Sequence, residues 1–169
     1  MRNILAIAER LRKLVQTLPR EVGEIIVNNT LDNFKNESLD GVKWVPRKDN
    51  SSDGERKGRR GLLIGTGQLR RSIRVIRIGN NSVVVGSEVP YAKIQNQGGT
   101  THPSITEKSR KFFWAMFEKT KNAKWKRMAL TEETNFTVNI PARPFLKVTP
   151  TLKRKIEIFV ADKIRNAIR

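Results

Sequence analysis

The chain has 169 residues, of which 37% are hydrophobic and 30% charged, and this composition predicts one globular domain with a buried core. Its 34 lysines and arginines outnumber 16 acidic residues, and the formal net charge of +18 indicates anionic partners such as nucleic acid or acidic proteins. The lack of cysteine excludes disulfide frameworks and thiolate chemistry, and the single histidine, His102, excludes a polyhistidine metal site. We therefore expect neither a metal nor a cofactor.

Residues 1–36 are predicted to be helical. One apolar stripe at steps of three and four covers residues 3–18, and the same spacing returns after Pro19. Because proline suits the first turn of a helix but breaks the hydrogen bonding of a helix interior, this segment is either two helices or one helix kinked at Pro19. Glu9 and Arg10 interrupt the apolar stretch, so we expect no secretory signal, no membrane span and a protein that stays where it is made.

Residues 47–60 form a predicted basic loop. The segment is rich in Asp, Asn, Ser, Gly, Arg and Lys and has no periodic apolar residues. It is longer than most connections within a compact domain, which is typical of a functional or disordered segment. We expect it to be exposed and mobile, and to act as an arm that orders against neighbouring molecules.

Residues 62–146 are predicted to form a small antiparallel sheet. β-Branched residues predict strands over 72–78 and 82–86, joined through a Gly-Asn-Asn turn into a hairpin, and the whole of 68–99 is expected to be mostly extended. A further short strand is expected over 137–140. Because strands and helices do not alternate as they do in parallel sheets, the predicted class is α+β.

Two helices are predicted in the second half of the chain. A Ser-x-x-Glu capping box precedes apolar residues at helical spacing, which predicts a helix over 104–120, followed by a basic linker over 119–127. Thr149 and Pro150 are suited to the N-cap and first turn of a last helix over 150–169. The predicted buried stripe of this last helix consists of Leu152, Ile156, Phe159, Val160, Ile164 and Ile168. We thus expect a single domain in which the sheet, with its inserted helix, is flanked by N-terminal and C-terminal helices.

Catalytic signatures are weak in this sequence. Gly65-Thr66-Gly67 precedes a predicted strand, whereas a dinucleotide-binding glycine motif follows a strand and opens a helix. His102 lies in a loop with no nucleophile or carboxylate suggested as its partner, and Glu132 and Glu133 pair with no second acid in a recognisable pattern. We therefore expect no enzyme. A hydrolytic activity would need a carboxylate pair or a nucleophile that the sequence does not indicate.

Clusters of cations are the strongest physical signal. Arg47–Arg77 contains ten lysines and arginines against three acids, and Lys108–Arg127 contains eight against Glu118, with Trp114 and Trp125 interleaved. Cations near aromatic side chains suit phosphate contacts and base stacking, although an acidic protein partner or simple solvation of a helix face also explains them. The candidate residues for contact with DNA or an acidic partner are Arg56, Lys57, Arg59, Arg60, Lys121, Lys124, Lys126 and Arg127.

Several blocks together resemble a known family. Gly-Val-Lys-Trp-Val-Pro at 41–46, Thr-Gly-Gln-Leu-Arg-Arg-Ser-Ile at 66–73, Tyr-Ala-Lys-Ile-Gln-Asn-Gln-Gly-Gly at 91–99 and Ile-Pro-Ala-Arg-Pro-Phe-Leu at 140–146 occur in the order found in tail-completion proteins of tailed bacteriophages. The chain is similar to this phage virion morphogenesis family over about residues 41–146. Asn96 stands at or near a place where the family often has histidine.

The resemblance implies a structural protein of a phage or prophage that acts in tail completion or head–tail joining. It implies an α+β subunit that assembles, as a ring, with copies of itself and with tail or connector proteins. It places the chain in the host bacterial cytoplasm during assembly and then in the tail or neck of the virion, with no membrane or small-molecule substrate. DNA passing through a channel of such a ring would tolerate a basic lining. The alternative function is a basic nucleic-acid-binding module.

The family's signature segments suggest where subunits meet. The residues that the resemblance implies for subunit contact, or for the fold of the docking surface, are Tyr91, Gln95, Gly98, Arg143, Pro144 and Phe145. Two structural alternatives stay open for this set. Arg143, between two prolines, could instead satisfy backbone carbonyls of its own subunit, and Phe145 could cover the core where the chain enters the last helix.

Overall fold

A computed structural model describes residues 2–47, 61–131 and 137–169. The chain forms two compact units: a main unit of Met1–Gln97 and Ala142–Arg169, and an inserted unit of Gly98–Pro141. The predicted mobile loop, apart from Arg47, lies outside the described residues. Among the residues described, no helix has the length and apolar character that a membrane crossing requires.

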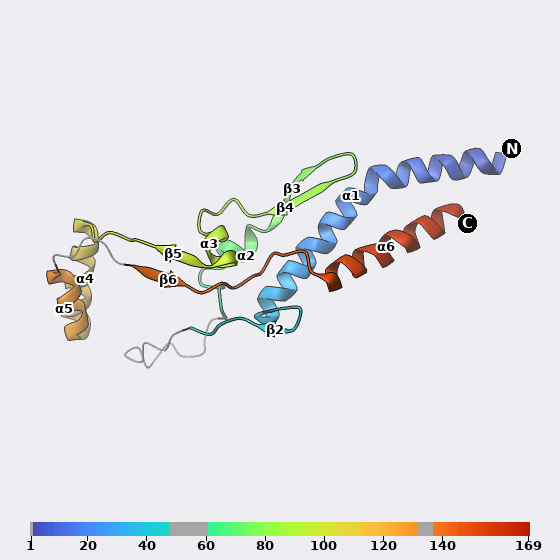
Figure 1. Ribbon diagram of the computed structural model, residues 1–169. Helices are drawn as coiled ribbons and strands as arrows, with labels where there is room; N and C mark the ends of the chain where they lie inside the picture. Colours follow the sequence, from blue (N-terminus) through green and yellow to red (C-terminus); the bar gives the residue numbers. More distant parts are fainter. Residues whose placement is uncertain (1, 48–60, 132–136) are drawn as a thin grey trace. The chain divides into compact units, whose positions relative to one another are not determined.

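The N-terminal segment is one helix, α1, from Arg2 to Asn36. Pro19 lies inside it, so of the two alternatives left open by the sequence, a single helix with an internal proline is correct. Because proline has no N–H, the carbonyl of Val15 lacks the donor that residue i+4 normally supplies. The ribbon of α1 changes direction partway along its length (Figure 1).

A tight hairpin that the sequence analysis missed follows α1. β1 (Ser38–Leu39) pairs antiparallel with β2 (Val42–Lys43), with Leu39 opposite Val42. The two connecting residues, Asp40 and Gly41, have φ values of 47° and 81°. Positive φ at both central positions is the mark of a type I′ turn, for which Asp-Gly is a favoured sequence.

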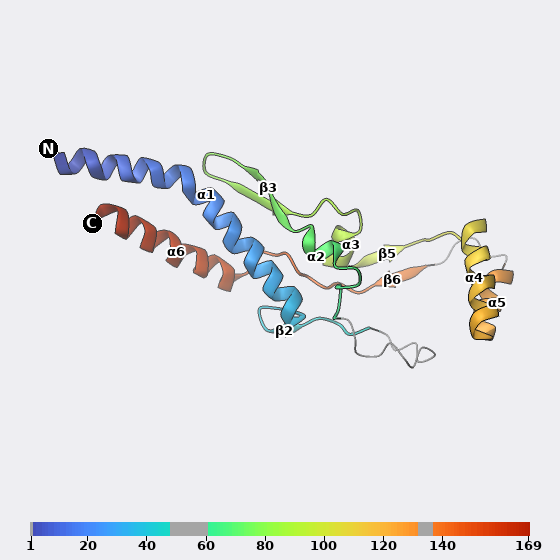
Figure 2. The ribbon, with the colours of Figure 1, turned by 180° about the vertical axis from the view of Figure 1, so that it is seen from behind.

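The longer predicted hairpin is confirmed. β3 (Arg74–Ile78) pairs antiparallel with β4 (Val83–Gly86), and the register shifts between Val75 and Arg77. The hairpin packs along α1 (Figures 1 and 2). The approach is close at Gly23, because a Cβ placed there would lie 2.7 Å from Cγ2 of Val75 and 2.9 Å from Cγ2 of Val83.

The prediction that 68–99 is mostly extended is wrong at two places. α2 (Gln68–Arg71) precedes β3, and α3 (Ala92–Gln97) follows β4. The Ala-Lys-Ile-Gln-Asn-Gln sequence of α3 has one β-branched residue among several good helix formers, which favours a helix over a strand. Gly67, with φ 77°, supplies the left-handed backbone from which α2 starts.

The last helix, α6 (Pro150–Ile168), begins as predicted: the Thr149 hydroxyl accepts a hydrogen bond from Leu152 N at 3.2 Å, and Pro150 lies in the first turn. α6 packs along α1 (Figures 1 and 2), where Lys163 Nζ lies 2.5 Å from a Glu21 carboxylate oxygen. The predicted buried stripe is correct at Leu152 but wrong at its end. Ile164 and Ile168 are exposed, because the described residues of the main unit provide no further layer there.

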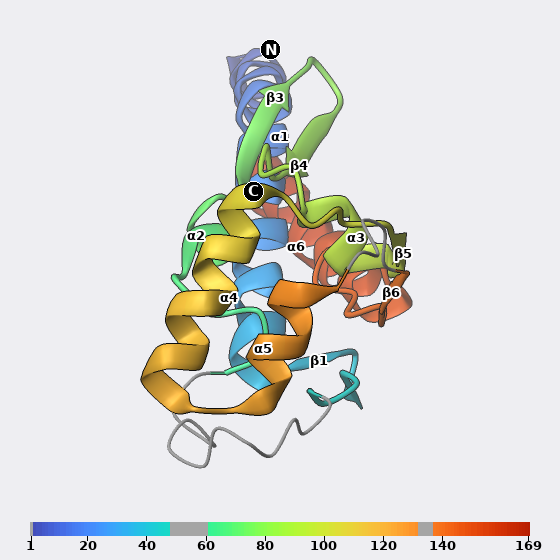
Figure 3. The same cartoon turned by 90° about the vertical axis from the view of Figure 1, so that its left-hand side faces the viewer.

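The inserted unit contains a short strand pair and two helices. β5 (Gly99–Thr101) pairs antiparallel with β6 (Val138–Ile140), which confirms the strand expected over 137–140. α4 (Glu107–Thr120) lies beside α5 (Ala123–Leu130) (Figure 3). The predicted helix starts three residues later than expected, because the Thr106 hydroxyl, at 3.2 Å from Ser109 N, is its cap.

The predicted basic linker is also wrong, since most of it is the helix α5. Asn122 caps this helix by accepting a hydrogen bond from Lys124 N at 2.9 Å. The described residues thus form three separate two-stranded antiparallel sheets in place of the one sheet expected, and the α+β class is confirmed. The core of the main unit consists of Phe34, Trp44, Leu69, Ile73, Ala92 and Phe145.

Candidate functional site

The segment Ala142–Leu146, which we call the strap, is tied to three elements of the main unit. Arg143 N donates to Gln95 O in α3 at 3.0 Å, and Trp44 Nε1, just after β2, donates to Pro144 O at 2.9 Å. Asn33 Nδ2 in α1 donates to Phe145 O at 3.0 Å. Much of the strap's backbone is therefore hydrogen-bonded although the strap does not lie in a sheet.

Asn96 supplies most of the remaining partners. Its Oδ1 accepts hydrogen bonds from Phe145 N and Leu146 N, both at 2.9 Å, and its Nδ2 donates to Leu146 O at 3.1 Å. One side-chain amide thus pairs with the strap much as a neighbouring strand would. We call this set of contacts the strap joint.

Phe145 is the apolar anchor of the strap joint. Its side chain is 2% exposed, and its ring centroid lies 5.0 Å from that of Phe34, which packs edge-on against Trp44 at 5.7 Å. The alternative that Phe145 covers the core is confirmed. Pro144 is half-buried beside it.

Arg143 binds its own chain. Its Nε donates to Val45 O at 2.9 Å and a terminal nitrogen donates to Pro46 O at 3.3 Å. Burial lowers the pKa of Arg143 below its usual value, and the charge of Arg47 lowers it further, whereas Glu37 opposes the shift. The structural alternative for Arg143, that it satisfies carbonyls of its own subunit, is confirmed.

Tyr91 and Gln95 line a pocket of about 310 Å³ on the main unit. The opposite wall comes from the loop of residues 63–69, and Arg47 lies at the same pocket. The Tyr91 hydroxyl donates a long, 3.4 Å hydrogen bond to Gln68 Oε1, and the side chain is 41% exposed. Gln95 Oε1 is buried and has no hydrogen-bond partner among the described residues. Because buried polar atoms are usually hydrogen-bonded, this oxygen marks an incompletely paired place at the pocket.

Gly98 follows α3 with φ 72°, a left-handed conformation that favours glycine. Of the predicted contact residues, Gln95, Arg143, Pro144 and Phe145 come together in the strap joint, Tyr91 lies with Gln95 at the pocket, and Gly98 shapes the backbone after α3. Sequence reasoning missed Asn33 and Asn96 as the side chains that hold the strap.

Uncovered apolar side chains form a second feature of the main unit. Ile4 and Leu5 of α1 are each 72% exposed, and Ile158 and Ile168 of α6 are more than half exposed.

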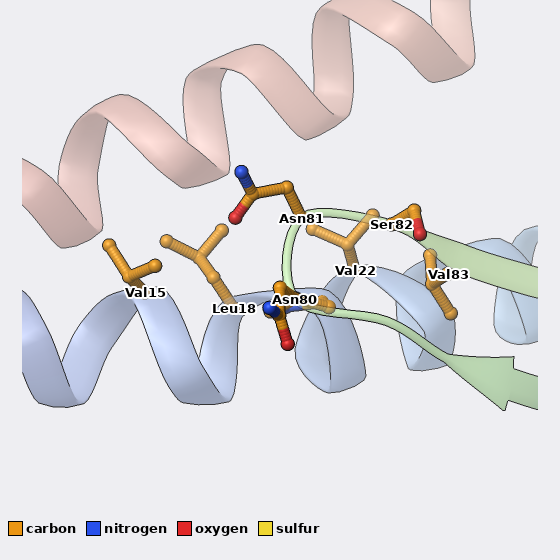
Figure 4. A pocket seen from close by; sticks show the side chains of 8 residues that line it. Val15, Leu18, Val22, Asn80, Asn81, Ser82 and Val83 are labelled. Carbon is orange, nitrogen blue, oxygen red and sulfur yellow. The ribbon is translucent and has the colours of Figure 1, made fainter.

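Near the bend of α1, a pocket of about 260 Å³ opens between that helix and the β3–β4 turn. Figure 4 shows Val15, Leu18 and Val22 of α1 facing Asn80–Val83 of the turn across this pocket.

The predicted contact cations fall into two groups. Arg56, Lys57, Arg59 and Arg60 lie outside the described residues. The other four are exposed. Lys121 lies on the turn between α4 and α5, and α5 itself carries Lys124, Lys126 and Arg127. These last four belong to the inserted unit.

His102 and the acidic residues form no recognisable catalytic or metal-binding cluster in the described part of the chain. His102 is exposed, with its Nδ1 3.4 Å from the Thr137 hydroxyl. No group of three or more histidine, aspartate or glutamate side chains within residues 2–47, 61–131 and 137–169 could hold a metal ion. Glu132 and Glu133 lie outside the described residues.

The described residues are those of a small α+β protein with exposed apolar side chains and exposed cations on its surface. The chain belongs to the phage virion morphogenesis family, whose model matches residues 2–165. This membership confirms the resemblance and makes the chain a virion morphogenesis protein of a structural family. Comparisons with curated proteins and with solved structures give no significant match.

Proposed function

We propose that this protein completes the phage tail or joins it to the head, through contacts between copies of itself in a ring and with tail or connector proteins. The uncovered apolar stripe of α1 carries the proposal. Ile4 and Leu5 are largely exposed, although their helical spacing continues that of half-covered residues such as Leu11 and Leu14. A contiguous exposed apolar stripe is typical of a surface that another protein covers.

The energetics favour such contacts once charge repulsion is screened. Burying one leucine or isoleucine side chain is worth about 1.5–3 kcal/mol, so covering Ile4, Leu5 and Ile168 in each subunit is a substantial gain. The net charge of +18 acts against association of identical chains, and salt weakens that repulsion. Association between copies is therefore expected to strengthen as salt rises.

The pocket beside the strap joint is the proposed second contact. Tyr91 is exposed and meets the neighbouring chain in this proposal, and Gln95 lines the same pocket. The strap joint supports this surface, because its hydrogen bonds hold Arg143, Pro144 and Phe145 in place. Gly98 supplies the left-handed backbone that follows α3. In this proposal the protein works in the host bacterial cytoplasm during assembly and then in the tail or neck.

Solution mass tests the proposal. Light scattering on the full chain should show a species of several subunits that grows with salt, and the variant Ile4→Ser, Leu5→Ser should shift it to the monomer. Val42→Ser is the control, because Val42 is equally exposed on the separate β1–β2 hairpin. A wild-type chain that stays monomeric at all salt concentrations, even with purified tails present, would contradict ring formation.

A further inference from the structure

Cations are dense at the turn between α4 and α5 and on the helix residues beside it. This cluster, which we call the basic turn, consists of five exposed side chains: Lys119, Lys121, Lys124, Lys126 and Arg127. α5 contains no acidic residue, and Glu118 is the single carboxylate between residues 108 and 131. None of these five cations takes part in a salt bridge with any residue that the structure describes, although Lys126 Nζ lies 5.9 Å from the centroid of the Phe117 ring. No described carboxylate therefore neutralises their charge, which is available to an outside partner.

Some of the aromatic residues of this helix pair contact one another between α4 and α5, whereas Phe112 and Trp114 are 54% and 39% exposed. Trp125 stacks on Phe113 with ring centroids 6.0 Å apart and meets Phe112 edge-on at 6.1 Å. Arg110 is also used internally, since it donates to Ala129 O at 2.8 Å near the end of α5. Of the two tryptophans interleaved with the cations, Trp125 therefore packs against α4, and Trp114 is exposed beside Phe117. Trp125 is engaged within the helix pair and is not free for base stacking.

The turn that presents the cations is fixed by hydrogen bonds. Lys121 adopts a left-handed conformation with φ 53°, and its N–H donates to Phe117 O at 2.7 Å. Asn122 then caps α5, and Trp125 N donates to Asn122 O at 3.1 Å. Two helix ends therefore hold Lys119, Lys121 and Lys124 in a defined arrangement, so that binding a partner costs little backbone ordering.

The composition of the basic turn favours a phosphate backbone over a protein. Four of its five cations are lysines, and lysine is depleted in protein–protein interfaces, whereas arginine and aromatic residues are enriched. Lysine and arginine contacts to phosphates position a protein on DNA without reading its sequence. We propose that the basic turn binds the phosphate backbone of duplex DNA without sequence preference, independently of the subunit contacts proposed above.

The salt dependence of DNA binding tests this inference. The full chain is titrated onto a fluorescent duplex of about 30 base pairs over a series of salt concentrations, beside the variant Lys121→Gln, Lys124→Gln, Arg127→Gln. The logarithm of the binding constant falls with log salt, and each lost phosphate contact makes this slope shallower by about 0.9. The slope of the variant should therefore be shallower by about 2–3, and its affinity for the duplex lower by about tenfold or more. Lys121→Arg, Lys124→Arg should bind as the wild type does.

A charge-matched control separates a site from overall charge. Lys153→Gln, Arg154→Gln, Lys155→Gln removes three exposed cations from α6 of the main unit and should leave the slope almost unchanged. Equal losses in both triple variants would overturn the inference, and so would wild-type binding by the basic-turn variant. If that variant binds DNA normally but fails to enter virions, the basic turn meets an acidic protein instead. The mass of the variant without DNA reports on ring formation separately.

Discussion

Asn96 shows how one side chain can replace a strand neighbour. An asparagine amide has a carbonyl acceptor and two N–H donors, and Asn96 uses both kinds of group on consecutive residues of the strap. Aspartate could keep the two acceptor bonds but would lose the donor to Leu146 O. The position of the strap therefore depends on an asparagine at position 96 as well as on the buried ring of Phe145.

Asn96→Ala should destabilise the main unit strongly. The change removes three hydrogen bonds and leaves Phe145 N and Leu146 N without partners in a partly buried place, which predicts a loss of about 2–4 kcal/mol in the free energy of unfolding. Urea unfolding measures it. Asn28→Ala, at an exposed position of α1, is the control and should change stability by less than about 0.5 kcal/mol. Similar effects of the two substitutions would show that the strap joint contributes little.

Local signals in the sequence decided which residues could be assigned in advance. Thr149 and Pro150 were predicted correctly at the start of α6, because capping depends on neighbouring residues. The role of Asn96 was not predictable, because its partners Phe145 and Leu146 are 49 and 50 residues away along the chain. For Arg143 the sequence left two roles open, and the carbonyls of Val45 and Pro46 that distinguish them lie almost 100 residues away.

Among the elements, the contact between α1 and the β3–β4 hairpin depends on a glycine, Gly23, at the place where they meet. Gly23 lies in the middle of a helix, where glycine is unfavourable by about 1 kcal/mol relative to alanine. The nearest side-chain atoms, Cγ2 of Val75 and of Val83, lie only 2.7 and 2.9 Å from the position that a Cβ would take. The close approach of helix and hairpin explains why this glycine is tolerated.

Gly23→Ala should therefore destabilise the protein despite the better helix propensity of alanine. The methyl group would overlap Cγ2 of Val75 and Val83, and overpacking of this kind costs about 1–3 kcal/mol. A double-mutant cycle with Val75→Ala is the measurement, because space made at Val75 should render the double variant more stable than the sum of the single effects. If the changes in stability of the two single variants simply add in the double variant, the β3–β4 hairpin moves away from α1 without cost and the prediction is wrong.

Elements with strong local patterns were predicted better than those without. The β3–β4 hairpin follows from its run of valine and isoleucine around a Gly-Asn-Asn turn. The β1–β2 hairpin was missed although Asp40-Gly41 signals it, because strands of two residues leave no alternating pattern. α5 was missed because its apolar residues face α4, a contact that the sequence pattern of eight residues does not specify.

On the scale of the whole molecule, the inserted unit leaves and rejoins the main unit at neighbouring points. The hydrogen bond from Arg143 N to Gln95 O places two positions of the main unit side by side, just outside the boundaries of the insertion. An insertion with adjacent ends interrupts the surrounding fold very little. The main unit also has its own core, formed wholly from residues 34–92 and Phe145.

Replacing residues 99–140 by a linker of about four glycines and serines should leave the main unit folded. Its free energy of unfolding should change by less than about 1 kcal/mol, because no core residue is removed. Urea unfolding followed by the fluorescence of Trp44 measures this, since Trp114 and Trp125 are deleted together with the insertion. A shortened chain that fails to fold would show that the main unit requires the insertion.

The strap joint has a consequence for the order in which the protein folds. Asn33 and the strap are 112 residues apart, and contacts of such sequence separation form slowly because a long loop must close first. During synthesis, Phe34 and Trp44 leave the ribosome long before Phe145 does. The contacts between α4 and α5, the main ones of this helix pair, are local in sequence, so the pair can fold in that interval. The nascent main unit, by contrast, remains without its central anchor until translation is almost complete, and that is when it most needs protection from aggregation.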